Sequence, residues 1–204
     1  MNAALGRAGV TLGLAAAILG VVTVGYGLLR RRSDLVRMSR WYAALVLLGG
    51  VVAAFAMERA LITRDFTVKY VADNGSTKTP ALYNFATLWG ALEGSIILWA
   101  LILGGYTVAV VLKFRKRLAD PLVGWALLTM LVVCVFFFFL LAGPANPFKT
   151  FAPPAGYDGP GPNPLLQNHP LMAFHPPMLY LGYVGFTVPF AFAIAALVTG
   201  RVGE

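Results

Sequence analysis

Two histidines, one carboxylate beside an apolar segment and several aromatic residues are the side chains of this 204-residue sequence best suited to chemistry. His175 stands directly before Pro176 and Pro177, and a residue that precedes a proline is disfavoured in the helical region. We therefore expect His175 to be extended, at the mouth of a helix whose first turn holds the two prolines. Because a neutral imidazole keeps one nitrogen lone pair, His175 is a candidate metal ligand.

Aromatic residues and glycines follow His175 along the chain. Tyr180, Tyr183 and Phe186 recur at intervals of three, which predicts an aromatic strip on roughly one side of a helix. Gly182 and Gly185 would let another helix or a flat ligand approach closely. A lone histidine at a membrane edge is also often an ordinary polar contact, so the residues alone leave both interpretations open.

A second group of candidate residues lies in the segment from Tyr83 to Trp99. A carboxylate near a membrane must be paired, hydrated or protonated, so Glu93 is either functional or a solvated, capping group on an interfacial helix. Trp89 and Trp99 are either ligand contacts or ordinary interfacial residues. The single cysteine, Cys134, lies within an apolar segment, and we interpret it as a small packing side chain.

Five apolar segments predict an all-α integral membrane protein. Hydrophobic residues make up 59% of the chain and charged residues 12%, with a mean hydropathy of +0.76, whereas soluble domains carry about 25% charge. Apolar runs of about 20 residues are expected to span the bilayer. We predict transmembrane helices at about residues 8–29, 41–57, 85–112, 122–142 and 178–198, with residues 85–94 as a partly interfacial lead-in. The first is too long for the apolar region of a signal peptide, so we expect it to be retained.

The distribution of basic residues predicts the orientation. Residues 30–40 hold five arginines and residues 113–120 hold four basic residues. The positive-inside rule places both connections in the cytoplasm, the N-terminus outside and the C-terminus inside. The two longer connections, residues 58–84 and 143–175, would then face the outer, periplasmic side. The net charge of +8 follows mostly from this topology, which argues against a nucleic-acid partner.

The two longer connections differ in composition. Asp65–Tyr70 alternates enough to predict a short strand, and Asp73–Thr79 has the composition of a turn. In residues 143–164 the density of proline and glycine excludes a helix or a central strand. Because this loop is tethered at both ends, an ordered cover over the membrane surface fits its sequence as well as disorder does. We expect His169 to be a hydrogen-bonding loop residue.

Three stretches resemble the N-terminal part of the CcmF family, the haem-lyase proteins of cytochrome c maturation, which are related to the NrfE and CcsA haem-handling proteins. They are Asp65–Val71, Trp89–Trp99 with its Trp-Gly and Glu-Gly-Ser elements, and Asn163–Phe186 with Asn-Pro-Leu-Leu-Gln and His-Pro-Pro. The Asn-Pro-Phe sequence at 146–148 matches as well, and the similarity runs from about residue 40 to the end. Leu92 stands where many relatives have histidine, so no role is transferred to that position.

The resemblance implies haem handling on the outer face of the plasma (inner) membrane, where haem is attached to the Cys-x-x-Cys-His thiols of apocytochrome c. His175 matches the first of two flanking histidines that would hold the haem iron, with Tyr180, Tyr183 and Trp89 as weaker candidates for lining the haem. The implied partners are membrane lipid, a CcmE-like haem chaperone, apocytochrome c, CcmH-like maturation subunits and the C-terminal part of CcmF.

The family's tryptophan-rich haem domain, second flanking histidine and haem-b histidines would all lie beyond residue 204. We therefore expect residues 1–204 to be an N-terminal transmembrane segment of a larger or split protein, inactive as a lyase by itself. The alternatives are a polytopic transporter or channel segment, in which Glu93 and the loop histidines would handle ions or protons, and a purely structural membrane subunit. Tryptophan-rich sequence further along the gene would favour the lyase, and inverted repeats would favour the transporter.

Overall fold

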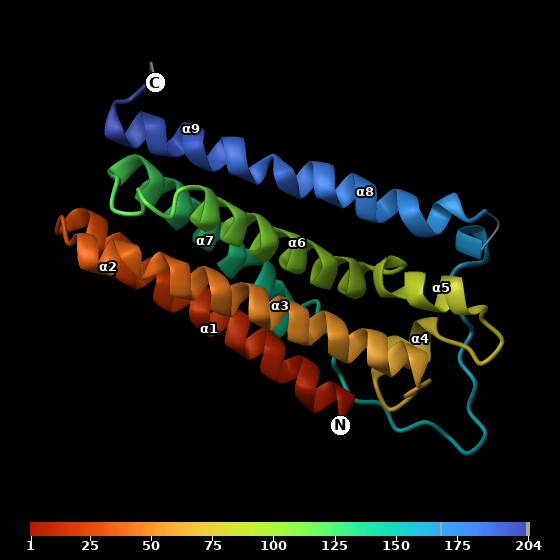
Figure 1. Cartoon of the computed structure of the whole chain (residues 1–204). Helices are drawn as coiled ribbons and strands as arrows, with labels where there is room; N and C mark the ends of the chain where they lie inside the picture. The colour runs from red at the N-terminus through yellow and green to blue at the C-terminus, as the bar shows by residue number, and fades with distance from the viewer. Residues whose placement is uncertain (168, 203–204) are drawn as a thin grey trace.

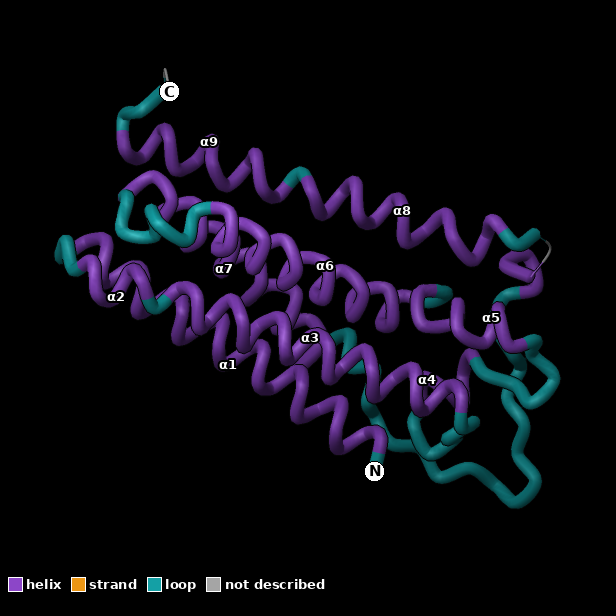
Figure 2. The backbone as a smooth tube through the Cα atoms, viewed as in Figure 1, coloured by secondary structure: helices purple, strands orange, loops and turns teal. Residues whose placement is uncertain are grey.

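The computed structural model describes residues 1–167 and 169–202, and this part of the chain forms helices joined by loops (Figures 1 and 2). The helices are α1 (Asn2–Leu29), α2 (Ser33–Arg37), α3 (Ser39–Ile62), α4 (Lys69–Asn74), α5 (Ala81–Ala86), α6 (Leu92–Lys113), α7 (Pro121–Ala142), α8 (Leu171–Gly185) and α9 (Thr187–Thr199), with the 3-10 helices η1 (Thr87–Trp89) and η2 (Pro164–Gln167). Five stretches of the described chain are long and apolar enough to cross a membrane: Asn2–Leu29, Ser33–Ile62, Leu92–Lys113, Pro121–Ala142 and Ala173–Thr199. The prediction of an all-helical chain with five segments long and apolar enough to span a membrane is confirmed for the described residues.

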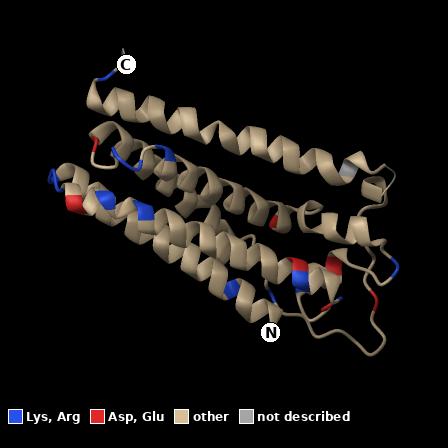
Figure 3. Cartoon of the chain, in the orientation of Figure 1, with Lys and Arg blue, Asp and Glu red and all other residues tan. Residues whose placement is uncertain are grey.

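The long helices run side by side, and the chain has two distinct ends (Figure 1). The α1–α2 turn, the α6–α7 connection and the end of α9 lie together at one end, which we call the basic end. The short helices α4 and α5 and residues 143–167 lie at the opposite end, which we call the loop end. Charged residues gather toward these two ends and are sparse between them (Figure 3), as expected of a membrane-embedded middle.

Small residues bring α1 and α3 into close contact. Gly9 and Gly13 lie one turn apart on α1, and a Cβ added to Gly49 of α3 would stand 2.6 Å from the Gly13 nitrogen. Backbone atoms occupy the space beside Gly9 and Gly49, so these two positions admit glycine alone without a shift of the helices, whereas the Phe138 ring fills the space beside Gly13. Around this contact, α1 also packs on α7, α3 on α6, α9 on α7 and α8 on α6. The interior holds Phe138, Met57 and Leu127, all fully buried.

Several helices begin or end at other residues than the predicted spans do. The second span ends at Ile62 rather than at residue 57 because the apolar helix continues past Glu58, with Leu61 fully buried. The third begins at Leu92 rather than at residue 85 because Ala91 is extended and separates α6 from the short helices before it. The first span begins at Asn2, earlier than predicted. The predicted lead-in is present as the separate elements α5 and η1.

The predicted strand at Asp65–Tyr70 is wrong. Lys69 begins α4, and Val68 makes one isolated antiparallel bridge to Thr150. Arg64 turns the chain sharply at the end of α3 with a φ of 53°, so the alternating residues after it have no neighbouring strand to pair with. An alternating pattern without a partner does not form a sheet.

The entrance to the fifth span differs most from expectation. Helix α8 begins at Leu171, so His175 is helical, and Pro176 and Pro177 lie inside the helix rather than in its first turn. Two contacts start the helix early: the Leu171 amide donates to His169 Nδ1 at 3.1 Å and the Ala173 amide to the Pro170 carbonyl at 2.9 Å. A turn at Phe186 separates α8 from α9. Pro189 lies three residues further on, and because it has no amide hydrogen it cannot donate a hydrogen bond to the preceding turn.

The proline-rich loop before η2 is fastened to the connection between α3 and α5. The Lys69 and Phe151 amides donate to the Lys149 and Thr67 carbonyls, both at 2.8 Å, and the Gly161 amide donates to the Gly75 carbonyl at 3.1 Å. Backbone hydrogen bonds at both ends of the loop therefore give it a defined path over the loop end. This path agrees with the expectation of an ordered cover and not with that of a disordered loop.

Phe148 anchors the start of this loop. Its side chain is fully buried against Gly6 of α1, where an added Cβ would collide with the aromatic ring. The Asn146 side chain accepts a 2.8 Å hydrogen bond from the Phe148 amide, which fixes the turn. The Asn-Pro-Phe sequence thus has a packing role.

Candidate functional site

A cavity of about 210 Å³ lies at the loop end between three parts of the chain. Its walls come from α5 and η1, from the end of the proline-rich loop with η2, and from α8. The lining residues are Tyr83, Ala86, Thr87, Trp89, Gly90, Pro162, Leu166, Pro176 and Tyr180. The structure thus brings together two of the aromatic residues singled out from the sequence, Trp89 and Tyr180.

Aromatic contacts hold both of these side chains. The Trp89 ring packs edge-on against Phe85, with centroids 5.2 Å apart. Tyr180 packs against Trp99 at 5.5 Å, and Trp99 in turn lies 5.4 Å from Phe137 of α7. Trp99 therefore supports the cavity wall from behind, a packing role rather than a ligand contact.

Tyr70 fixes the turn that carries Trp89. Its buried hydroxyl donates to the Thr87 carbonyl at 2.7 Å and lies 3.2 Å from the Leu88 carbonyl. Burial, reinforced by the nearby Glu93 and Glu58 carboxyl groups, raises the pKa of Tyr70. The phenol consequently remains a neutral donor, as this geometry requires.

Gly94 of α6 packs directly against the Leu88 carbonyl and the Tyr70 hydroxyl. A Cβ at this position would collide with the Leu88 carbonyl and the Tyr70 hydroxyl. The glycine of the Glu-Gly-Ser sequence is thus required by close packing. Its neighbour Glu93 is half-buried in the first turn of α6, where the partial positive charge of the helix terminus favours a carboxylate.

Glu93 also lines a small polar recess with Lys69 and Lys149. Lys69 forms its ion pair with Asp73 in the same recess, and the N-terminus of α6 favours a carboxylate at Glu93. These contacts favour the solvated, capping interpretation of Glu93 over a role in ion transfer.

Glu58 is a buried carboxyl group that was not singled out from the sequence, and it lies on the helix that packs against α5 and η1. It had been placed in a loop, but it lies on α3, and both carboxyl oxygens are buried without a hydrogen-bond partner among the described residues. The same holds for Trp89 Nε1 and Asn84 Oδ1, and α3 packs against the α5–η1 segment that carries them. The apolar residues continuing to Ile62 were the signal that Glu58 is helical.

His175 lies outside the cavity, on the exposed face of α8. Exposed apolar side chains flank it by one helical turn on either side, Leu171 at 64% and Met178 at 63% exposure. Tyr183 is 65% exposed and does not line the cavity. The predicted single aromatic strip is therefore divided, because Tyr180 faces the cavity whereas Tyr183 and Phe186 face outward.

His169 has a structural role in the described chain. Its Nδ1 accepts the hydrogen bond from the Leu171 amide, one of the groups at a helix start that has no partner within the helix. The expectation of a hydrogen-bonding loop residue is confirmed.

The side chains of the described residues determine whether the loop end can bind a bare metal ion or the iron of a porphyrin. They contain no group of three or more His, Cys, Asp or Glu side chains that could bind a bare ion. A porphyrin iron brings four nitrogen ligands of its own and needs the protein only at its axial positions. An exposed imidazole on a flat apolar helix face fits that requirement. The cavity beside it is smaller than the roughly 300–1,000 Å³ of typical cofactor pockets, so it does not enclose a haem.

Comparison with known proteins gives one consistent match. The family model described as "Cytochrome C assembly protein" matches residues 89–202. The cytochrome c-type biogenesis protein CcmF of Escherichia coli (strain K12) is 40% identical over 198 residues, which is 97% of this chain and 30% of that protein. CcmF of Pseudomonas fluorescens is 48% identical over 143 residues, which is 70% of this chain and 21% of that protein.

A solved structure gives the same result for the fold. A protein described as "Cytochrome c Heme Lyase CcmF" superposes with a TM-score of 0.84 at 37% identity, over 98% of this chain and 31% of that one. The chain therefore spans less than a third of the length of these relatives.

Proposed function

Since this chain belongs to the CcmF/NrfE/CycK family of cytochrome c assembly proteins, we propose that it supplies one transmembrane part and one axial haem ligand of a membrane haem lyase. The lyase would hold haem at the loop end and attach it to the Cys-x-x-Cys-His thiols of apocytochrome c. The exposed imidazole of His175 on an apolar helix face is the observation that carries this proposal.

His175 would bind the haem iron from one side through an imidazole nitrogen. The apolar surface formed by Leu171, Met178 and Leu179, at 64%, 63% and 39% exposure, would lie against the porphyrin and exclude water from that face. Haem supplies the vinyl groups to which the thiols add, and the chain supplies position and ligation. The second axial ligand would come from a chain segment outside residues 1–204.

The cavity behind α8 would position this ligand. Pro176 follows His175 directly and lines the cavity together with Trp89 and Tyr180. Since Trp89 is held by the contact of Tyr70 with η1, the cavity wall would fix the rotation of α8 and therefore the direction of the imidazole. Trp89 and Tyr180 would act through α8. Tyr183, which is 65% exposed on the same helix as His175, would remain a weaker candidate for lining the haem.

The basic residues at the opposite end support an orientation with the loop end on the periplasmic side of the plasma membrane. Haem delivery from a CcmE-like chaperone and presentation of apocytochrome c by CcmH-like subunits would then both occur at the loop end. The position of Glu93, in the first turn of α6 and at the edge of a small polar recess, favours a capping carboxylate over the transporter interpretation.

The proposal is tested in the assembled lyase that contains this chain by replacing each histidine with alanine. His175→Ala should insert normally, lose the haem held at the loop end and abolish cytochrome c maturation. Added imidazole should restore haem retention in part, because it can occupy the vacated axial position. His169→Ala, which removes a helix-start contact, should retain haem.

The readouts are membrane insertion, haem content and the absorption spectrum of the purified protein. A His175→Ala protein that keeps a six-coordinate, low-spin haem spectrum would contradict the assignment. Loss of haem only in His169→Ala would show that the wrong histidine had been chosen.

A further inference from the structure

A second cavity, of about 520 Å³, opens at the basic end, at the opposite end of the helices from α5 (Figure 1). It is bounded by the α1–α2 corner, by the start of α7 and by the end of α9. Two arginines, Arg31 and Arg201, line it together with Ser33 and Trp125. A cavity with two guanidinium groups and a hydroxyl donor is suited to an anionic, oxygen-rich ligand.

The backbone holds Arg31 in an uncommon conformation at the cavity wall. Helix α1 ends with hydrogen bonds from the Arg31 amide to the Leu28 carbonyl, at 3.3 Å, and from the Arg32 amide to the Gly27 carbonyl, at 2.7 Å. This pattern is the Schellman motif, in which the residue at the position of Arg31 is usually glycine. Arg31 has a φ of 55°, so a position suited to glycine carries a guanidinium group that lines the cavity.

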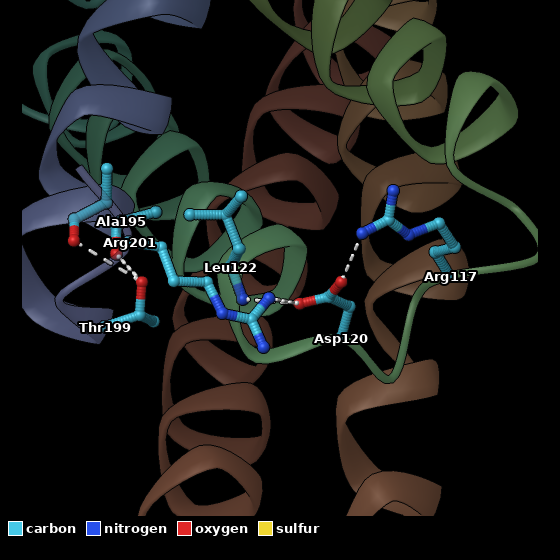
Figure 4. A network of polar contacts seen from close by, with 7 residues as sticks. Arg117, Asp120, Leu122, Ala195, Thr199 and Arg201 are labelled. Atoms are coloured by element: carbon cyan, nitrogen blue, oxygen red, sulfur yellow. Dashed lines mark hydrogen bonds and ion pairs between the residues drawn. The ribbon is translucent and has the colours of Figure 1, made fainter. Parts of the chain in front are cut away.

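A polar network fixes the second arginine (Figure 4). Arg201 Nη1 donates to Asp120 Oδ1 at 2.9 Å, and Asp120 also accepts from Arg117 at 2.7 Å and from the Leu122 amide at 3.0 Å. Asp120 begins α7 as its N-cap and shares its single negative charge between two arginines. The network ties the end of α9 to the start of α7 and leaves a net positive charge at the cavity.

The remaining carboxylate near the cavity is also compensated. Asp34 forms an ion pair with Arg32 at 2.7 Å, so it does not cancel the charge of Arg31, and Asp120 compensates Arg201 only in part because it is shared with Arg117. Removing Arg31 would therefore lower the positive potential of the cavity directly.

An apolar face leads from this cavity toward the middle of the membrane. Trp125 lines the cavity, and the same face of α7 continues through Thr129, Val132, Phe136 and Phe139 at intervals of three and four residues. The last three are 50%, 57% and 59% exposed. Because α1 and α9 each pack on α7, this face provides a path for an acyl chain directly below the basic cavity.

We propose that the basic-end cavity binds the phosphate headgroup of an anionic phospholipid, whose acyl chains lie along the exposed face of α7. Arg31 and Arg201 contact the phosphate, Ser33 donates to one of its oxygens, and Trp125 packs at the level of the glycerol. Basic cavities between transmembrane helices are suited to such headgroups. This site is independent of His175 and of the haem proposal.

The experiment uses the full chain in mixed micelles of detergent and phosphatidylcholine. Acyl-brominated phosphatidylglycerol is titrated in, and quenching of tryptophan fluorescence is recorded, with Trp125→Phe identifying the signal of Trp125. Brominated phosphatidylglycerol should quench Trp125 at a mole fraction about fivefold or more below that of brominated phosphatidylcholine, the effect expected from one arginine at a lipid headgroup.

Arg31→Gly is the informative variant, because glycine suits a φ of 55° and should leave the helix end intact. Arg31→Gly should lose the preference for phosphatidylglycerol and keep its unfolding temperature. Arg201→Gln should also lose this lipid preference. Lys116→Gln removes one exposed charge at the same end, outside the cavity, and should keep the preference.

Three outcomes would overturn the proposal. Equal quenching by the two brominated lipids would show that the cavity does not select an anionic headgroup. Displacement of brominated phosphatidylglycerol by an equal concentration of inorganic phosphate would identify a site for soluble phosphate instead. An equal loss of lipid preference in Lys116→Gln and Arg31→Gly would show that the preference comes from the overall positive charge of the basic end and not from the cavity.

Discussion

The Tyr70 hydroxyl on α4 donates a 2.7 Å hydrogen bond to the Thr87 carbonyl, although 17 residues separate the two in sequence. The bond joins the connection after α3 to the 3-10 turn that carries Trp89. Because the Leu88 carbonyl lies 3.2 Å from the same hydroxyl, one phenol serves two buried acceptors. The cavity wall beside α8 depends on this contact.

Tyr70→Phe should destabilise the protein by about 1 kcal/mol, because the Thr87 carbonyl loses one of its two donors and keeps only the Gly90 amide. Thermal unfolding in detergent, followed by tryptophan fluorescence, measures the change. Tyr183→Phe is the matched control, since it removes a hydroxyl from a side chain that is 65% exposed. Equal unfolding temperatures for the two variants would show that the Tyr70 hydrogen bond contributes nothing.

Gly94→Ala should cost about 1–3 kcal/mol, because the added methyl group meets the backbone carbonyl of Leu88, which cannot rotate away. Gly105→Ala in the same helix is the control, because no atom lies within 4 Å of its added Cβ. The control should unfold at the same or a higher temperature, since alanine is the better helix former. A stable Gly94→Ala protein would contradict the close packing of α6 against η1.

Asp158→Ala should expose the proline-rich loop to proteinase K. The Asp158 carboxylate accepts from the Thr77 amide at 2.8 Å and the Thr77 hydroxyl at 2.7 Å, and so holds the loop against the connection between α4 and α5. Asp73→Ala removes a carboxylate of similar exposure whose ion pair with Lys69 lies within α4, and its cleavage rate should match the parent. Mapping the first cleavage sites distinguishes the loop from other regions.

Loop protection should also depend on pH. Hydrogen bonds from the Thr77 amide and hydroxyl hold the pKa of Asp158 below its ordinary value. A lowered pKa in the folded state means that the carboxylate stabilises the loop above about pH 4 and that this contribution is lost as the pH falls further. Pepsin cleavage of the loop should therefore accelerate on acidification below about pH 4 in the parent, and less so in Asp158→Ala.

The proposed orientation predicts the accessibility of single cysteines. In a background lacking Cys134, an impermeant thiol reagent should label a cysteine at Lys78 in intact cells and should not label one at Ser33 until the membrane is opened. Both positions are exposed, whereas the neighbouring Ser76 is 6% exposed and would label poorly. The reverse labelling pattern would invert the topology.

The sequence was sufficient for the helical membrane architecture, because lipid constrains the chain in a way that composition records. A span requires about 20 apolar residues wherever its neighbours lie, so the five segments could be recognised one at a time. The family was also readable from local motifs, such as the segment from Asn163 to Phe186, since these motifs keep their residues in order along the chain.

Contacts between residues far apart in the chain could not be predicted from the sequence. The rule that a residue before proline avoids the helix misplaced His175, because contacts at His169 and Pro170 start α8 before the prolines. The apparent strand at Asp65–Tyr70 failed because it meets the segment around Thr150 at one isolated bridge among the described residues. Sheet pairing and helix starts depend on partners that a local pattern does not contain.

The tertiary structure alone assembled the two cavities. Trp89 and Tyr180 are 91 positions apart in the numbering, and Arg31 and Arg201 are 170 apart, yet each pair lines one cavity. The burial of Glu58 and the required glycine at Gly94 likewise follow from how helices pack. Residue types and hydrophobic periods determine which segments enter the membrane, whereas the side chains that meet there are decided by helix packing, a property of the whole fold.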